Sequence, residues 1–186
     1  LNGMTCAVTG GAHGLGRGIA ELFLDMGCTV HALDKDRRAL NAWGKETTAR
    51  GLPIHLHVTD VADPVSVKAT FRKIRALDIL VNNAGVAFPK PFTDMSISDW
   101  DKVQGVHVRG MFLCSHFVVP SMIERGKGNI INMVGSFGIK PEGLFAHVSA
   151  AKASMIAFTR ALAHELSPQG VRVNAVCPAM IKTEMI

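Results

Sequence analysis

The sequence predicts an α/β domain built on a doubly wound parallel sheet with helices on both of its faces. Two patterns predict this class. Short apolar runs with the length of buried strands recur along the chain, and segments with helical spacing separate them. Strands that alternate with helices in this way pair in parallel through right-handed crossovers. With 186 residues, 48% of them apolar, the chain is expected to fold as a single domain over residues 1–186.

The expected strands are short apolar runs bounded by turn residues. They lie at residues 4–8, 29–33, 54–58, 79–81, 130–134 and 171–176. Because ligands bind beyond the carboxyl ends of parallel strands, the residues that follow these runs should gather at one ligand-binding edge. These residues are Gly10, Asp34, Asp60, Asn82 and Gly135.

The segments between the strands have helical spacing. They are an amphipathic segment at 18–26, a helix at 37–50, a short helix at 65–74 capped by Asp63, a segment at 96–125 bent around Gly105 and Gly110, and a helix at 144–166. The last helix has apolar residues on more than one face. One face is explained by packing on the sheet, and the other indicates a subunit interface.

Three glycines mark the turn after the first strand as a candidate binding site. Gly10, Gly14 and Gly16 permit a sharp turn, close approach of a ligand to the backbone, and tight packing of the helix start. A helix N-terminus there would direct free N–H groups at an anion, of which a pyrophosphate is the usual example. Taken alone, the glycines also leave open a plain strand-to-helix turn without a ligand.

An acidic residue strengthens the interpretation of this turn as a dinucleotide site. Asp34 ends the second strand, eighteen residues after Gly16, where its carboxylate can accept hydrogen bonds from a ribose diol. The same carboxylate would repel a 2′-phosphate. NAD(H) is therefore expected rather than NADP(H), although the neighbouring Lys35 weakens the preference.

Composition argues against several other function classes. The net charge of +5 is scattered and the chain has no Tyr, so a nucleic acid partner is not expected. No apolar run approaches the length of a membrane span, and no signal-like segment begins the chain. The four widely spaced cysteines fit reduced thiols in a cytoplasmic protein. Because the chain starts at Leu1 and stops soon after the last strand, both ends look trimmed.

Motifs spread over nearly the whole chain resemble those of the short-chain dehydrogenases/reductases. The matching pieces are Thr9-Gly10 with Gly14 and Gly16, Asp34, Asp60-Val61, Asn82-Asn83-Ala84-Gly85, the strand 129–133, Ser149-Ala150-Ala151-Lys152, and residues 172–178. The resemblance implies a Rossmann-like sheet, a nicotinamide cofactor, and hydride transfer with a small alcohol or ketone. It also implies a homo-dimer or homo-tetramer, and it places the last strand and substrate lid of relatives after residue 186.

The resemblance assigns roles to individual residues. Asp60 and Val61 would hold the adenine, Asn83 and Gly85 would line the cofactor, and Lys152 would bind the nicotinamide ribose. The whole expected cofactor set is Gly10, His13, Gly14, Leu15, Gly16, Asp34, Asp60, Val61, Asn83, Ala84, Gly85, Lys152, Pro178 and Thr183, the last of which would reach the carboxamide. A cation at Lys152 fits this role, since it donates to ribose hydroxyls.

Three of the family's four catalytic positions differ in this chain. Val148 stands where the family has Tyr, Gly135 where it has Ser, and His107 where it has Asn. Valine and glycine side chains transfer no proton, so the usual mechanism is not available. His107 is the expected substitute acid beside Lys152, and Ser136 could turn its hydroxyl inward.

Three functions remain open at this point. The first is an NAD(H)-dependent oxidoreductase with an atypical or weakened catalytic site. The second is an NAD-binding protein without redox turnover, acting as a sensor or structural subunit, and the third is an inactivated or truncated variant. No metal site is expected: His55 and His57 share one strand face, but a third ligand at good spacing is missing.

Overall fold

The computed structural model describes residues 1–74, 76–179 and 181, and its sheet has the predicted architecture. Six parallel strands lie in the order β3-β2-β1-β4-β5-β6. They are β1 (Thr5–Thr9), β2 (Thr29–Asp34), β3 (Ile54–Val58), β4 (Ile79–Asn82), β5 (Gly128–Met133) and β6 (Val171–Val176). The chain winds outward from β1 to β3 and then crosses to β4 on the other side of β1. Ligands of such sheets bind beside this reversal, at the carboxyl ends of β1 and β4.

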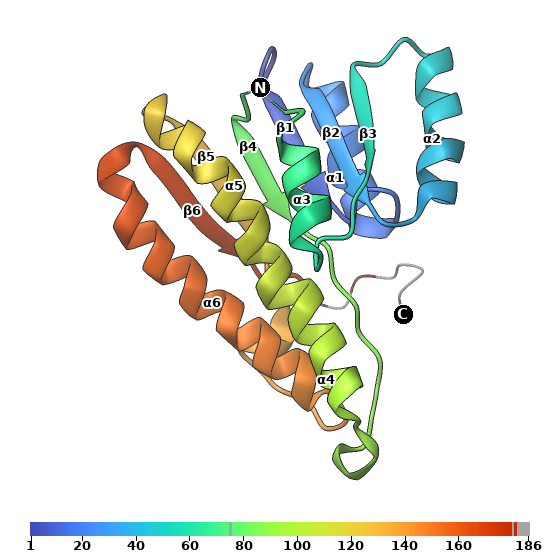
Figure 1. Ribbon diagram of the computed structural model, residues 1–186, viewed down its shortest axis with the longest axis vertical. Coiled ribbons are helices and arrows are strands. Elements are labelled where there is room, and N and C mark those ends of the chain that lie inside the picture. Colours follow the sequence, from blue (N-terminus) through green and yellow to red (C-terminus); the bar gives the residue numbers. More distant parts are fainter. Residues whose placement is uncertain (75, 180, 182–186) are drawn as a thin grey trace.

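Helices cover both faces of the sheet, as predicted (Figure 1). One face carries α1 (Gly14–Asp25) and α2 (Arg37–Ala49). The other carries α3 (Pro64–Phe71), α5 (Gly110–Glu124) and α6 (Ala146–Leu166), while α4 (Ile97–Gln104) continues the line of α5 and packs on α6. The prediction that the first helix starts near residue 18 is wrong. Apolar spacing marks only the part that packs on the sheet, whereas the first turn at Gly14 is set by the glycine backbone.

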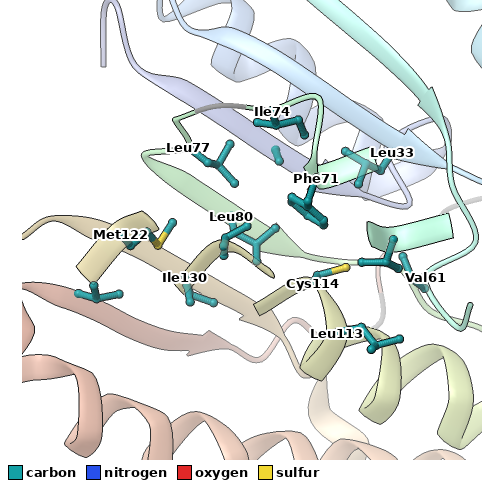
Figure 2. Packing of buried hydrophobic residues seen from close by; sticks show 14 of the residues in the cluster. Leu33, Val61, Phe71, Ile74, Leu77, Leu80, Leu113, Cys114, Met122 and Ile130 are labelled. Atoms are coloured by element: carbon teal, nitrogen blue, oxygen red, sulfur yellow. The ribbon is translucent and has the colours of Figure 1, made fainter. Parts of the chain in front are cut away.

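Successive side chains of the central strands point to opposite faces of the sheet, so the core has two layers. Ala7, Leu80 and Ile130 face α3 and α5, where buried side chains such as Phe71 and Cys114 close the layer (Figure 2). The intervening strand residues, which include Cys6, Val8 and Ile79, pack against α1 and α2. Burial on both faces is why these strands appear in the sequence as continuous apolar runs.

The predicted interruption of the long helical segment is a stretch of π-helix. It spans Gly105–Arg109 and joins α4 to α5. Within the described residues, the continuous helical stretch Ile97–Glu124 is long and apolar enough to cross a membrane by length and composition, with 44% of its most apolar window buried in the protein. Several α5 side chains of that stretch lie in the core between the helix and the sheet (Figure 2).

A third imidazole joins the two that share a face of β3. His31 on β2 pairs in register with His55, and its ring stacks on His55 and His57 with centroid separations of 4.7 and 5.2 Å. Nδ1 of His31 lies 2.9 Å from Nε2 of His57. The spacing of residues along β3 does not indicate this third imidazole, because the register between two strands is not visible in the sequence of one of them. Among the described residues, even so, no three His, Cys, Asp or Glu side chains form a group that could hold a metal.

This histidine cluster is expected to make the fold acid-sensitive. Burial, followed by the charges of neighbouring imidazoles, lowers the pKa of His31 to about 4, and burial with the charges of His55 and Lys73 lowers that of His57 to about 4. Since the unfolded chain binds protons near pH 6.5, stability is complete above that pH and falls as the pH drops toward 4. We expect a loss on the order of 3 kcal/mol.

Urea denaturation at pH 7.5 and pH 5 measures this loss. His57→Gln should reduce the difference between the two pH values. His164→Gln, which changes an exposed histidine of α6, should leave the difference unchanged. An equal pH dependence in wild type and His57→Gln would show that the cluster does not cause it.

Candidate functional site

A cavity of about 670 Å³ opens at the carboxyl ends of the strands and runs from the glycine turn to α6. It contains every predicted cofactor or catalytic residue that the structure describes. These are Gly10, His13, Gly14, Leu15, Gly16, Asp34, Asp60, Val61, Asn83, Ala84, Gly85, His107, Ser136, Lys152 and Pro178. Thr183 lies outside the described residues. The fold therefore brings these residues together, and their individual roles remain predictions.

Close packing of backbone on backbone explains the glycines of the turn. Gly10 has a φ of +63°, and a Cβ there would lie 2.9 Å from Cα of Ala84. A Cβ on Gly16 would overlap the carbonyl oxygen of Gly10 and lie 2.5 Å from Nδ2 of Asn83. That Nδ2 in turn donates to the carbonyl oxygens of Thr9 and Gly10, at 3.0 and 3.3 Å. Asn83 therefore locks the turn onto β4, a structural task beside its predicted place against a cofactor.

The start of α1 faces the cavity with its positive end uncompensated. The first turn of α1 contains no acidic residue, and the N-cap position is His13 without a side-chain capping bond. Free N–H groups at such an end favour an anion. Three glycines of the turn, Gly10, Gly14 and Gly16, thus line the cavity with backbone atoms at this helix end.

Two carboxylates and one ammonium group occupy the end of the cavity beside β2. Asp34 is held by backbone amides, with Ala12 N donating to Oδ2 at 3.1 Å and Asp36 N donating to Oδ1 at 3.0 Å. Asp36 caps α2 and lies 3.1 Å from Nε2 of His13. The backbone N–H of residue 39 and the bond to His13 lower the pKa of Asp36. Lys35 lies between these carboxylates in the sequence and lines the same cavity.

Lys152 projects from α6 into the opposite end of the cavity. Its Nζ donates to the carbonyl oxygen of Met133 at 2.8 Å, and no described carboxylate pairs with it. Burial lowers the pKa of Lys152 to about 8, an effect that the charge of Cys177 partly opposes. Val148 lies one helical turn earlier and is 1% exposed. The amine therefore lies in a largely apolar environment, with no phenol beside it.

The backbone at Gly135 leaves room for a small group beside this amine. Gly135 has a φ of +80°, and a Cβ built on it would have Cε of Lys152 and the carbonyl oxygen of Pro178 as its nearest neighbours, both at 3.9 Å. Ser136 follows, with its backbone N donating to that same Pro178 oxygen at 3.1 Å. A small ligand can therefore approach Lys152 from the side of β5.

His107 lies in the π-helix and is 3% exposed. Its Nε2 is 2.9 Å from the carbonyl oxygen and 3.1 Å from the amide nitrogen of Val86, so its tautomer decides which hydrogen bond forms. Burial and the charge of Lys152 lower the pKa of His107 to about 3. At neutral pH this imidazole is an uncharged hydrogen-bonding group, and as a substitute acid it would have to act from its neutral form.

The second ring nitrogen of His107 and a nearby side-chain oxygen lack hydrogen-bond partners in the described part of the chain. Nδ1 of His107 and Oδ1 of Asn82 are both buried without a hydrogen bond among the described residues, and both residues border a small cavity of about 10 Å³. His147, by contrast, does not line the large cavity; it is fully buried and its ring meets Phe88 edge-on at 4.9 Å.

Sequence reasoning missed the apolar wall near Lys152. Phe137 and Phe145 stack at 4.9 Å and line the cavity together with Val86 and Val148. Both phenylalanines lie in the segment between β5 and α6, which lacks the periodicity of a strand or helix. The pairing of these loop residues with the site could not be found from spacing alone.

Comparisons with known proteins agree with this architecture. The family model described as short chain dehydrogenase matches residues 4–186. The chain is 40% identical over 185 residues to nodulation protein G of Azospirillum brasilense, covering 96% of this chain and 75% of that protein. It is 36% identical over 191 residues to a 3-oxoacyl-(acyl-carrier-protein) reductase of Thermotoga maritima, covering 100% of this chain and 77% of that protein.

A solved structure is similar over the same extent. It is a putative NAD(P) dependent gluconate 5-dehydrogenase from Beutenbergia cavernae, with bound NADP at low occupancy. The TM-score is 0.93 at 29% sequence identity, and the match covers 99% of this chain and 75% of that chain.

Proposed function

This chain belongs to the short-chain dehydrogenase family, and we propose that it binds a nicotinamide dinucleotide and exchanges a hydride between it and a small alcohol or carbonyl compound. One observation carries this proposal: a single cavity joins the glycine turn to Lys152. Its length accommodates an extended ligand, with one end at the positive terminus of α1 and the other beside an amine.

The residues of the cavity fit a dinucleotide. The glycine turn at Gly10, Gly14 and Gly16, which lines the cavity at the start of α1, would receive the pyrophosphate. Asp60 and Val61 would hold the adenine, and Lys152 would donate to the nicotinamide ribose. When bound, the dinucleotide supplies or accepts a hydride.

We propose that Lys152 also handles the proton of the reaction. A pKa of about 8 leaves its amine mostly protonated at pH 7, so the ammonium group can donate to a carbonyl oxygen and supply a proton as charge develops there. Ser136 and the neutral ring of His107 would contribute hydrogen bonds. Because position 148 is a valine, no tyrosine hydroxyl is present there to transfer the proton.

A second candidate function is dinucleotide binding without turnover. The observation that favours it is the apolar surrounding of Lys152, where Val148 and Phe145 face the cavity. NADH fluorescence followed by a panel of alcohols and ketones separates the two. Binding without turnover above that of Lys152→Ala would support the second function, and binding with Lys152-dependent turnover supports the first. Failure to bind NADH and NADPH would contradict both.

We propose NAD(H) as the preferred cofactor. Asp34 and Asp36 place two carboxylates at the end of the cavity beside β2, against the single ammonium group of Lys35. A 2′-phosphate there would meet like charge, at a cost of about 1 kcal/mol per pair even at the dielectric constant of bulk water.

Asp34→Asn is therefore expected to narrow the preference for NADH over NADPH by about tenfold. Dissociation constants of both dinucleotides, measured by fluorescence, check this. Asp25→Asn removes a charge at the end of α1, away from the cavity, and should leave the ratio unchanged. A ratio that is the same in Asp34→Asn and wild type would contradict the assignment.

We also propose self-association through α5 and α6 and a cytoplasmic location. Apolar side chains such as Phe112, which is 46% exposed, remain at the surface of α5. All four cysteines are free, and three of them are buried, which suits a reducing compartment.

A further inference from the structure

Three features of the surroundings of Lys152 bear on the reactivity of its amine. The side chain is largely buried, its Nζ has a carbonyl oxygen as hydrogen-bond acceptor and no carboxylate partner among the described residues, and the position one turn before it is a valine. A lysine in such surroundings exposes an amine to a ligand cavity without a neighbouring group that keeps it charged.

We propose that Lys152 is a nucleophilic amine that forms an imine with aldehydes entering the cavity when the dinucleotide is absent. The cavity reaches this amine directly. Gly135 lines the cavity beside Lys152, and a carbon atom built on it would be in van der Waals contact with Cε of Lys152 and the Pro178 oxygen, both at 3.9 Å, without overlap. Phe137, Phe145 and Val148 supply an apolar wall for the remainder of the aldehyde.

The chemistry of this step balances with groups that are present. The lone pair of neutral Nζ attacks the carbonyl carbon, a C–N bond forms, and a proton moves from nitrogen to oxygen to give a carbinolamine. A proton from solvent on that hydroxyl lets water leave as the C=N bond forms, and the nitrogen returns its remaining proton to solvent to give the imine. Ser136 lines the cavity and offers a hydroxyl that can hydrogen-bond the departing oxygen.

Burial favours the neutral amine that this step needs. The pKa of about 8 leaves a substantial neutral fraction near pH 7.5, whereas an exposed lysine titrates near 10.4. Among the described residues, His107 and Cys177 are the titratable groups whose charges couple to Lys152. Neither is a carboxylate that would hold the ammonium form.

Borohydride trapping tests the proposal on the wild-type protein. We would incubate the dinucleotide-free protein with benzaldehyde and sodium cyanoborohydride at pH 7.5, and then map the alkylated lysines by peptide mass spectrometry. Lys140, which is exposed in the neighbouring loop, is the internal control. Lys152 should be alkylated about tenfold to a hundredfold faster than Lys140.

Two variants sharpen the result. Lys152→Arg should lose the fast site and keep the slow labelling of Lys140. Val148→Tyr should slow labelling at Lys152, because the phenol would fill the space beside the amine. Labelling of Lys152 no faster than that of Lys140 in the wild-type protein would overturn the proposal. NADH fluorescence is a separate readout, so failure of dinucleotide binding leaves this result unaffected.

Discussion

Gly16→Ala is expected to weaken NADH binding by about a hundredfold and to destabilise the fold by about 2 kcal/mol. The added Cβ would overlap the Gly10 carbonyl oxygen and press on Nδ2 of Asn83. Both neighbours are fixed, since the oxygen belongs to the backbone and the amide already donates to the turn. The turn must therefore open, and the proposed site for a pyrophosphate is lost.

A matched control lies two residues along the same helix. Gly18 is exposed in α1, and a Cβ on it would meet nothing within 4 Å. Gly18→Ala should keep NADH affinity and raise stability by about 0.5–1 kcal/mol, because alanine is the better helix former. NADH fluorescence titration and urea denaturation of both variants check these expectations. Wild-type NADH affinity in a folded Gly16→Ala protein would refute the assignment of the turn.

Val148→Tyr is expected to raise the rate of carbonyl reduction by about 10²–10⁴-fold, the usual contribution of a positioned acid. Position 148 lines the cavity one helical turn before Lys152, so a phenol there would lie beside the amine and could transfer a proton to the substrate. The ammonium group of Lys152 would lower the pKa of that phenol.

Val148→Phe distinguishes the effect of the tyrosine hydroxyl on the rate from the effect of its aromatic ring. It adds the same aromatic ring beside Val103 and Ala151 but has no proton to transfer. NADH oxidation with a ketone panel should therefore rise in the Tyr variant alone. Equal rates in the Tyr and Phe variants would show that proton transfer at this position does not limit the reaction.

Gly135→Ser, added to Val148→Tyr, should lower the stability of the fold, because a φ of +80° strains any residue with a Cβ.

Much of the fold could be predicted because its determinants are local. Continuous apolar runs marked all six strands, and the bend around Gly105 and Gly110 was visible from the glycines alone. The residues at which helices begin and end were predicted less accurately. The first helix begins at Gly14 because the glycine turn itself supplies its first turn, which apolar spacing does not record.

The sequence by itself determined the order of the elements and the edge of the sheet at which the predicted ligand-binding residues gather. Gly10, Asp34, Asp60, Gly135 and Lys152 lie where a parallel α/β sheet must bring them together, and one cavity contains them. Asn82 was predicted to join them, but it is buried and its side-chain amide donates to Ser115 and Asn132 instead. Their spacing along the chain was sufficient because the topology of crossovers is nearly fixed.

Only the tertiary structure decided the electrostatic character of these groups. Burial makes His107 neutral and brings the pKa of Lys152 to about 8, and strand register brings His31 onto His55 and His57. Desolvation and register depend on side chains contributed by distant segments. A pattern read along one segment contains no information about what will cover it, which is why the chemistry of this site had to come from the fold.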